Sequence, residues 1–415
     1  MIVAGLAPAI LGDLADKVGR RIVYIFMMTT YCTANIGLAL QSDWSALFVL
    51  RMLQSAGSAA TIALGYGIVS DIAPPSERGS FVSIMVLGPN IATAVGPIIG
   101  AALSSYLSWR WIFLFLAILS GTCLLMLTMF LPETARSIVG DGSGRVSGLR
   151  RTVLSYLQNS IRSFSNEKSE GYRNEPIASN EESTGSILRS LNPLDSLKLL
   201  WAKDTVLITL IFGIFYMNLS ALQASTSTLF ISVYGVSGLQ LGLIYLPSGI
   251  GSCLGAYGAA RKHDIHIDVR AGDDLDSFPI EKARFRSTWY LIGVGTISLI
   301  GYGWSMHFQV HMAVPLVLHF LIGFSTAIIF NMSGTLLVDI HPKSPSSAQA
   351  ANSIVRAFLA GGSTALVQIF IDAMGVGWTF TIFGMAGLGC VLAAWLEWSC
   401  GQDWRARMRA NGVER

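Results

Sequence analysis

The chain has 415 residues, of which 52% are hydrophobic and only 13% are charged, and its formal net charge is +3. A soluble domain usually carries about 25% charged residues, and a soluble fold of this composition would expose large apolar patches to water. The composition therefore excludes an ordinary soluble protein and predicts an all-α protein that crosses the lipid bilayer many times.

Ten stretches are apolar enough for a membrane-spanning helix, which needs about 20 residues. They lie at 22–41, 46–70, 80–105, 110–131, 204–231, 236–259, 288–306, 312–338, 347–371 and 377–398, after a half-length run at 1–11. A polar segment rich in Ser, Asn, Glu and Arg follows the fourth span, and its composition is typical of a disordered linker. We expect a partial N-terminal bundle at 1–131, a cytoplasmic linker at 132–203, a six-helix bundle at 204–398 and a cytoplasmic tail at 399–415.

Lysine and arginine are segregated along the chain, and this predicts its orientation because cytoplasmic loops hold an excess of both. Of the 28 basic residues, 25 fall in the first loop, in alternate loops after it and in the C-terminal tail. Arg110 lies in an outer loop, and Arg51 and Arg356 lie within spans. We therefore expect the C-terminus to be cytoplasmic.

A fixed offset of 268 residues relates the two sides of the linker. Residues 71–76, which end a long span, match residues 339–344 at four of six positions, and the same offset pairs Arg51 with His319. These matches predict two parallel repeats about an axis along the membrane normal, as in one large class of transporters. Because the first repeat has fewer spans than the second, we expect one helix and about half of another to be missing from the N-terminus.

Residues 12–21 read Gly-Asp-Leu-Ala-Asp-Lys-Val-Gly-Arg-Arg and resemble the GxLaDxxGRR signature between the second and third helices of the major facilitator superfamily. We expect a loop in which the glycines permit a tight turn and the second aspartate caps a neighbouring helix. An ordinary positive-inside loop is the alternative reading. The resemblance implies a gating role for Gly12, Asp16, Gly19, Arg20 and Arg21.

Arg51 and Gln54 resemble the RxxQGxg motif of the superfamily's fourth helix, with Ser55 in place of a glycine. An arginine inside a span costs a few kcal/mol unless it faces a polar interior. In the superfamily this arginine is tied to proton coupling, so the resemblance implies that role. The alternative is that Arg51 extends to the outer interface.

Two Gly-Pro pairs eight residues apart resemble the GPxxGG motif of the fifth helix, which marks antiporters in the superfamily. Glycines remove side chains and prolines free backbone carbonyls, so we expect a bent helix against which a partner can rock. The residues of this motif are Gly88, Pro89, Gly96, Pro97 and Gly100.

Residues 131–143 are very similar to the segment after the sixth helix in fungal quinidine-resistance-type exporters, which belong to the twelve-span drug:proton antiporter branch. Residues 335–339, 350–356 and 375–380 also resemble that subfamily. The resemblance implies a major facilitator fold with two helical bundles, here without the first helix and part of the second. It implies no enzymatic activity, cofactor or metal.

Polar side chains within the spans are further candidates for the transport path. Asn352 and Arg356 lie one helical turn apart and share a face, and Arg356 is about 14 Å from the start of its span. We expect both to line a central cavity with Gln223 and Asn331, although polar groups of this kind also form ordinary interhelical hydrogen bonds. His319 is a candidate for proton coupling because histidine titrates near pH 6.5, and a histidine bonded to a backbone carbonyl is the alternative.

The resemblance implies a monomeric transporter in the plasma membrane that exports drugs or other small organic molecules in exchange for protons, and that binds no nucleic acid. The acidic residues lie in loops, in tails or at span ends, which leaves the proton carrier open between a residue of the missing first helix and Asp71, Asp339, Asp372 or His319. The alternative is a truncated product that transports nothing or interferes with a full-length partner.

Overall fold

The computed structural model describes residues 2–73, 77–139, 152, 203–271, 288–341 and 345–410. Before the linker it contains α1 (Ile2–Val18), α2 (Arg20–Leu40), α3 (Trp44–Ala59), α4 (Thr61–Ile72), α5 (Arg78–Tyr106), α6 (Trp109–Phe130) and α7 (Arg136–Val139). After it come α11 (Lys203–Tyr234), α12 (Leu239–Leu243), α13 (Leu246–Ala271), α15 (Thr288–His307), α16 (Ala313–Ile340), α17 (Pro345–Met374) and α18 (Val376–Ala410). Most of the predicted linker and the end of the predicted tail lie outside the described residues, so those assignments stay predictions.

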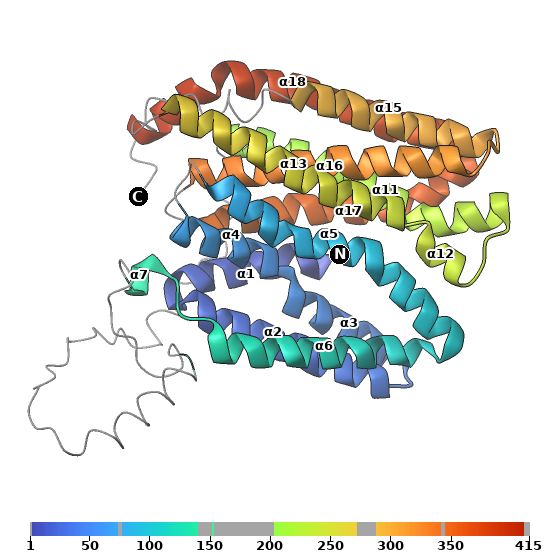
Figure 1. Ribbon diagram of the computed structural model, residues 1–415, viewed down its shortest axis with the longest axis horizontal. Coiled ribbons are helices and arrows are strands. Elements are labelled where there is room, and N and C mark those ends of the chain that lie inside the picture. The colour runs from blue at the N-terminus through green and yellow to red at the C-terminus, as the bar shows by residue number, and fades with distance from the viewer. Residues whose placement is uncertain are drawn as a thin grey trace, which may run out of the picture.

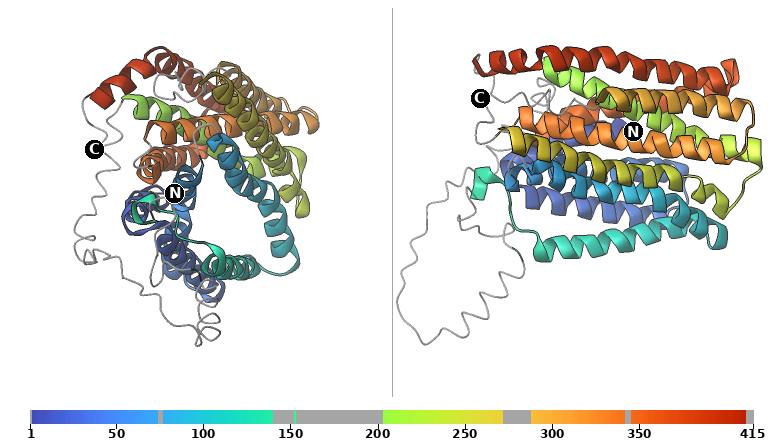
Figure 2. Two further views of the ribbon diagram at one scale, coloured as in Figure 1. Left: turned by 60° about the vertical axis from the view of Figure 1, so that its left-hand side comes forward. Right: turned by 45° about the horizontal axis from the view of Figure 1, so that its top comes forward.

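The long helices run roughly parallel to the longest axis of the molecule (Figures 1 and 2). Within the described ranges, nine helical stretches are long and apolar enough to cross a membrane. The sequence predicts ten spans, and the one at 288–306, which forms the 20-residue helix α15, is not among these nine. The prediction of an all-helical protein with many membrane spans is confirmed.

The predicted loop at 12–21 is wrong in its extent. α1 continues to Val18 and α2 begins at Arg20, so Gly19 is the only residue between the two helices. Gly12 therefore lies within a helix and makes no turn. Gly19 does turn the chain, because its φ of 120° belongs to a region that glycine adopts readily and other residues rarely do.

The helix bounds repeat at the offset of 268 that relates the two sequence motifs. Adding 268 to α2, to the α3–α4 pair and to α5 gives 288–308, 312–340 and 346–374, whereas α15, α16 and α17 occupy 288–307, 313–340 and 345–374. α18 also begins within one residue of the position equivalent to the start of α6. The two halves of the molecule therefore share one helix order.

The two most extensive helix pairs between the halves follow the same repeat. α1 packs on α17, and α13 packs on α5, the helix equivalent to α17. Both crossings are close because they contain glycine: a Cβ atom added to Gly5 would lie 2.6 Å from Cβ of Ala357, and one added to Gly249 would lie 2.5 Å from Cα of Ala94. Without these Cβ atoms the helix backbones can approach each other directly.

The glycines of the α5 motif do not form the close crossing with α13. Cβ atoms added to them would meet no atom of the described chain within 4 Å, and this holds for Gly88, Gly96 and Gly100. The glycine at the crossing, Gly249, belongs to the other half, and on the neighbouring helix α12 a Cβ at Gly242 would lie 2.8 Å from the carbonyl oxygen of Pro97. α5 also continues unbroken through both of its prolines. In this structure the three motif glycines therefore make no close helix contact within the described residues, and the expected bend and rocking role of the motif stay predictions.

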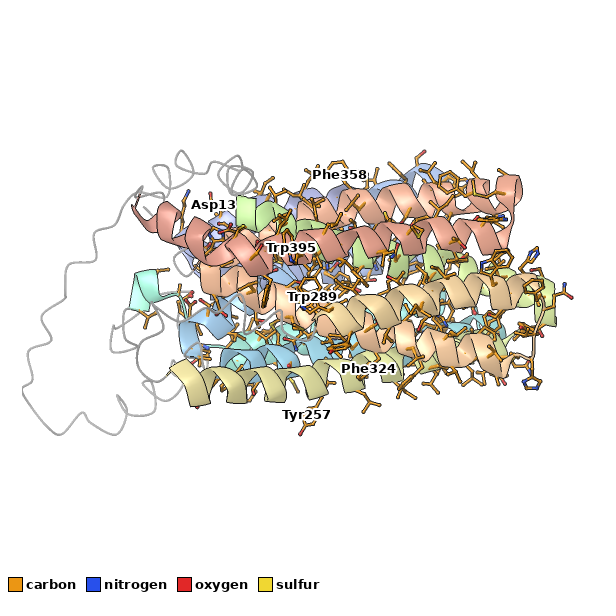
Figure 3. The ribbon with its side chains drawn as sticks, turned by 90° about the horizontal axis from the view of Figure 1, so that it is seen from above. Asp13, Tyr257, Trp289, Phe324, Phe358 and Trp395 are labelled. Atoms are coloured by element: carbon orange, nitrogen blue, oxygen red, sulfur yellow. The ribbon has the colours of Figure 1, made fainter. Side chains whose placement is uncertain are left out.

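Large apolar side chains cover the outside of the molecule, as contact with lipid requires. Tyr257 on α13 and Phe358 on α17 project from opposite sides (Figure 3) and are 62% and 55% exposed. Exposed aromatic rings also lie near the helix ends, where they suit the membrane–water interface; they include Trp44, Tyr106, Trp109, Tyr290 and Trp398.

Gly249→Ala tests the crossing of α5 and α13. The added methyl group would overlap the backbone of Ala94, so we expect a loss of about 1–3 kcal/mol in the free energy of unfolding, as for other overpacked sites. The measurement is thermal unfolding of the purified protein in detergent. Gly258→Ala on the same helix is the control, because its Cβ would meet nothing within 4 Å and alanine favours a helix by up to about 1 kcal/mol. Equal stability of the two variants would contradict the role of Gly249.

Candidate functional site

Arg20 is the centre of a buried ion cluster at the end of the molecule where α6 ends and α11 begins, which we call the linker end. The Arg20 residue is only 3% exposed. Its Nη1 lies 2.7 Å from Oδ1 of Asp16, and its Nε donates a hydrogen bond of 3.1 Å to Oδ2 of Asp71. Breaking such a cluster is costly because it leaves a buried charge uncompensated. Two of the predicted gating residues, Asp16 and Arg20, are thus in direct contact.

Glu133 supports this corner from the segment after α6. Its Oε1 accepts the backbone N–H of Arg20 at 2.8 Å and its Oε2 that of Arg21 at 3.3 Å, both in the first turn of α2. Oε1 also accepts the N–H groups of Thr134 and Ala135, at 3.1 Å each. A carboxylate at a helix N-terminus is favourable because it meets unpaired N–H groups and the positive end of the helix dipole.

Gly19 and Arg21 complete the corner. A Cβ atom at Gly19 would lie 2.9 Å from Cδ of Glu133, so the close approach as well as the backbone conformation requires glycine. The guanidinium of Arg21 donates to the carbonyl oxygen of Thr128 at 2.7 Å and to that of Leu131. These bonds attach the end of α6 to the start of α2.

The linker end also carries polar contacts to and within the second half. Oγ of Ser347, in the first turn of α17, donates to Oδ2 of Asp16 at 3.1 Å, which agrees with the prediction that this aspartate faces a neighbouring helix start. Beyond the end of α16, Nε2 of His341 lies 2.9 Å from Oγ1 of Thr205 on α11. Burial lowers the pKa of His341 from 6.5 to about 4.

Arg51 and Gln54 are brought together on α3, as the sequence predicts. Nη1 of Arg51 donates to Oε1 of Gln54 at 3.0 Å, and Nε2 of Gln54 donates to Oδ1 of Asn35 on α2 at 2.7 Å. The guanidinium carbon of Arg51 lies 4.7 Å from the ring centroid of Phe113. Arg51 forms no ion pair with any described residue.

Further polar contacts lie between the halves. Nδ2 of Asn331 on α16 donates to Oγ of Ser83 on α5 at 2.5 Å, so this predicted cavity residue bridges the two bundles. Tyr66 on α4 is buried, and a Cβ atom added to Gly334 on α16 would lie 2.7 Å from its Cζ. Positions 66 and 334 differ by 268, so two equivalent positions touch. Such a contact marks the axis that relates the halves.

Arg356 and Asn352 lie beside this axis on α17. The guanidinium carbon of Arg356 is 4.8 Å from the ring centroid of Tyr216 on α11. Nδ2 of Asn352 donates to Oε1 of Gln349 at 3.3 Å, and Nε2 of Gln349 donates to the carbonyl oxygen of Gly334 at 2.8 Å. These predicted residues therefore share one polar cluster.

His319 and Gln223 lie in a different part of the second half. The His319 side chain is fully buried on α16, with ring centroids 6.3 Å from that of Tyr245 and 5.9 Å from that of Tyr302. Neither ring nitrogen of His319 has a hydrogen-bond partner among the described residues. Gln223 accepts the hydroxyl of Tyr245 through its backbone carbonyl at 3.1 Å. His319 is therefore not assembled with Arg51, although the sequence suggests one role for both.

Sequence reasoning missed four residues that build these contacts, namely Tyr66, Ser83, Glu133 and Gln349. Glu133 carried a usable signal, because an acid directly after a span and a proline is suited to helix N-termini. The other three are common polar residues in apolar helices, and their role depends on the crossing of helices far apart in the sequence. No group of three His, Cys, Asp or Glu in the described ranges is placed to hold a metal ion.

Comparison with known proteins identifies the class. The family model described as Major Facilitator Superfamily matches residues 1–365. The chain is 35% identical over 398 residues to the MFS-type transporter phiD and 35% identical over 411 residues to the MFS-type transporter phiL, both from the same fungal species. These alignments cover 93% and 95% of this chain, but 59% of phiD and 95% of phiL. The chain is also 34% identical over 437 residues to Citrate exporter 1 of Aspergillus niger, covering 99% of this chain and 80% of that protein.

Solved structures agree on the fold. The proton:xylose symporter XylE superposes with a TM-score of 0.65 at 16% identity, covering 96% of this chain and 83% of that one. The human organic anion transporter MFSD10 superposes with a TM-score of 0.62 at 16% identity, covering 95% and 81%. The chain belongs to the major facilitator superfamily, and it is a multi-pass membrane transporter rather than an enzyme.

Glu133→Gln tests the corner at the linker end. The amide cannot accept four N–H groups and carries no charge, so we expect a loss of about 1–3 kcal/mol in the free energy of unfolding. Asp43→Asn is the matched control, because Asp43 lies at the N-cap of α3 without a side-chain hydrogen bond to it. Thermal unfolding in detergent measures both variants, and an equal shift would show that the Glu133 bonds contribute nothing.

His341→Gln tests the buried imidazole beside Thr205. The pKa of His341 is about 4 in the folded protein and about 6.5 in an unfolded chain, so below pH 6.5 the unfolded state takes up a proton that the folded state does not. The stability contributed by the neutral ring is therefore present above pH 6.5 and is lost as the pH falls toward 4. We expect the melting temperature of the variant to fall less over this range than that of the unmodified protein. If the melting temperatures of the two proteins fell equally with pH, the stabilising role of the neutral His341 ring would be contradicted.

Proposed function

We propose that this protein is a proton-coupled antiporter that exports small organic molecules, drugs among them, by alternating access. In this proposal it acts as a monomer in the plasma membrane, with the linker end and the C-terminus on the cytoplasmic side. The observation that carries the proposal is the contact between the halves, which combines two glycine-containing helix crossings with a polar latch at the linker end.

The latch consists of Asp16, Arg20 and Ser347. Asp16 is held in place by Arg20 within the first half and accepts a hydrogen bond from Ser347 in the second. Opening the linker end breaks the hydrogen bond from Ser347 and leaves Asp16 paired with Arg20. The close crossings of α1 with α17 and of α5 with α13 then allow the bundles to tilt without a change of fold.

Proton entry supplies the driving force in this proposal. Moving one charge through the membrane potential yields about 2.3 kcal/mol per 100 mV. It can drive export if the proton and the substrate favour opposite states of the transporter. Arg51 is a positive charge within a span and has no ion pair among the described residues, so it can lower the proton affinity of a nearby carrier. His319 is the candidate carrier of the second half.

The relatives support export of small molecules and leave the substrate to experiment. Three are named MFS-type transporter or citrate exporter, and the motifs resemble those of drug exporters. Quinidine and citrate therefore represent the two substrate classes that the proposal has to separate.

Arg51→Ala tests proton coupling in vesicles that contain the purified protein. A pH gradient is imposed, and the uptake of radiolabelled quinidine and citrate is followed with and without it. We expect the gradient-driven rate to fall by about tenfold or more, which corresponds to a typical coupling free energy of 1–3 kcal/mol. Arg51→Lys keeps the charge and should retain more of the coupling than Arg51→Ala.

Two outcomes would overturn the proposal. Equal transport with and without the gradient would reject antiport, and full coupling in Arg51→Ala would remove the arginine from the mechanism. If folded protein in the vesicles moves neither compound under any gradient, the alternative of a non-transporting membrane protein is the better reading.

A further inference from the structure

Arg356 is a positive charge deep in the second half without a carboxylate beside it. From Pro345 to Arg356 the helix rises about 16 Å, roughly halfway through a hydrocarbon layer of about 30 Å. The ion pairs of Arg20 with Asp16 and Asp71 lie at the linker end, whereas the guanidinium of Arg356 faces the ring of Tyr216. Charges at this depth are rare and mark the path of a substrate or an ion. The cation–π contact offsets only part of the cost, so the position favours an anion.

Asn352 provides a second group that lacks a partner, one helical turn from Arg356. Asn352 is buried, with only 3% of its surface exposed. Its Oδ1 has no hydrogen-bond donor among the described residues. The orientation of the amide is fixed, because Nε2 of Gln349 is used by Gly334 and its Oε1 must accept from Nδ2 of Asn352. The free oxygen therefore requires a donor, such as a hydroxyl group.

The surroundings suit a small organic molecule. The ring of Tyr216 lies 5.6 Å from that of Phe330, which stacks on Phe212 at 4.3 Å. Subtracting 268 from 356 gives Gly88, where an added Cβ would meet nothing within 4 Å. The first half therefore has no arginine equivalent to Arg356, and the positive charge of the site comes from the second half.

We infer that the substrate is an organic anion that carries a carboxylate and a neighbouring hydroxyl group. The guanidinium of Arg356 binds the carboxylate through its parallel N–H donors, and Oδ1 of Asn352 accepts the hydroxyl. The ring of Tyr216, which packs against the guanidinium, positions Arg356. This inference rests on the proposed transport function and names the substrate class for it.

The test measures binding to the full-length protein in detergent at pH 7.5, separately from transport. Isothermal titration compares citrate with tricarballylate, which has the same carboxylates and lacks the hydroxyl group, and with quinidine, a cation. We expect the unmodified protein to bind citrate more tightly than tricarballylate and to bind quinidine weakly. Arg356→Gln should weaken citrate binding about 10- to 100-fold, as loss of a charge-assisted hydrogen bond predicts.

Asn352→Leu should remove the preference for citrate over tricarballylate while leaving the binding of tricarballylate nearly unchanged. Arg110→Gln is the control for loss of a positive charge, because Arg110 also faces an aromatic ring, that of Trp109, but lies outside the cluster. Arg356→Lys should restore part of the affinity lost in Arg356→Gln. The comparison of the three ligands uses the unmodified protein, so it tests the inference even if a variant does not fold.

Each outcome separates this inference from the proposed function. Citrate binding that depends on Arg356, without gradient-driven transport, would keep the inference and reject antiport. Gradient-driven quinidine transport that is unchanged in Arg356→Gln, with no citrate binding, would keep antiport and overturn the inference. Equal affinities for citrate and tricarballylate would overturn the role of Asn352.

Discussion

The structure depends on one constraint, which is that a charge in hydrocarbon must have a partner. At the linker end the constraint is met within the protein: Arg20 lies between Asp16 and Asp71, and the carboxylate of Glu133 is satisfied by four backbone N–H groups. Arg356 meets an aromatic ring instead of a carboxylate. The first arrangement fixes a corner of the fold, and the second leaves electrostatic attraction that a ligand can satisfy.

Much of the fold could be predicted because lipid simplifies the sequence pattern. Eight of the ten predicted spans correspond to one helix each, and those at 46–70 and 236–259 correspond to two consecutive helices each. The ends differ by a few residues over most of the chain, since the length of a span is set by the bilayer. The exception is informative. The sequence of residues 12–18 is typical of a loop, yet these residues continue α1. They can do so because Asp13 and Lys17 form an ion pair along the helix and Asp16 forms one with Arg20. The polar residues there indicate where the helix leaves the membrane, and not where the helix ends.

The site was less predictable, and the reason is physical. Motif residues such as Arg51 and Gln54 are neighbours on one helix, so their contact follows from spacing alone. The bonds of Asn331 to Ser83 and of Ser347 to Asp16 join residues from opposite halves, and their pairing is decided by how closely the helices approach. That approach depends on glycines whose role is invisible in one sequence: Gly249 meets α5, whereas Gly96 meets nothing.

The internal repeat explains the shape of the molecule, and departures from it explain its chemistry. Tyr66 can occupy the axis only because its equivalent, Gly334, has no side chain to exclude it. Arg356 is likewise equivalent in the repeat to Gly88, so a large charged residue of one half has a glycine as its counterpart in the other. Two identical halves would place the same side chains on both sides of the axis. Such a site could not match the different groups of one asymmetric solute. Because the halves share helices but not side chains, they can move as equivalent bodies while they present different groups to whatever binds between them.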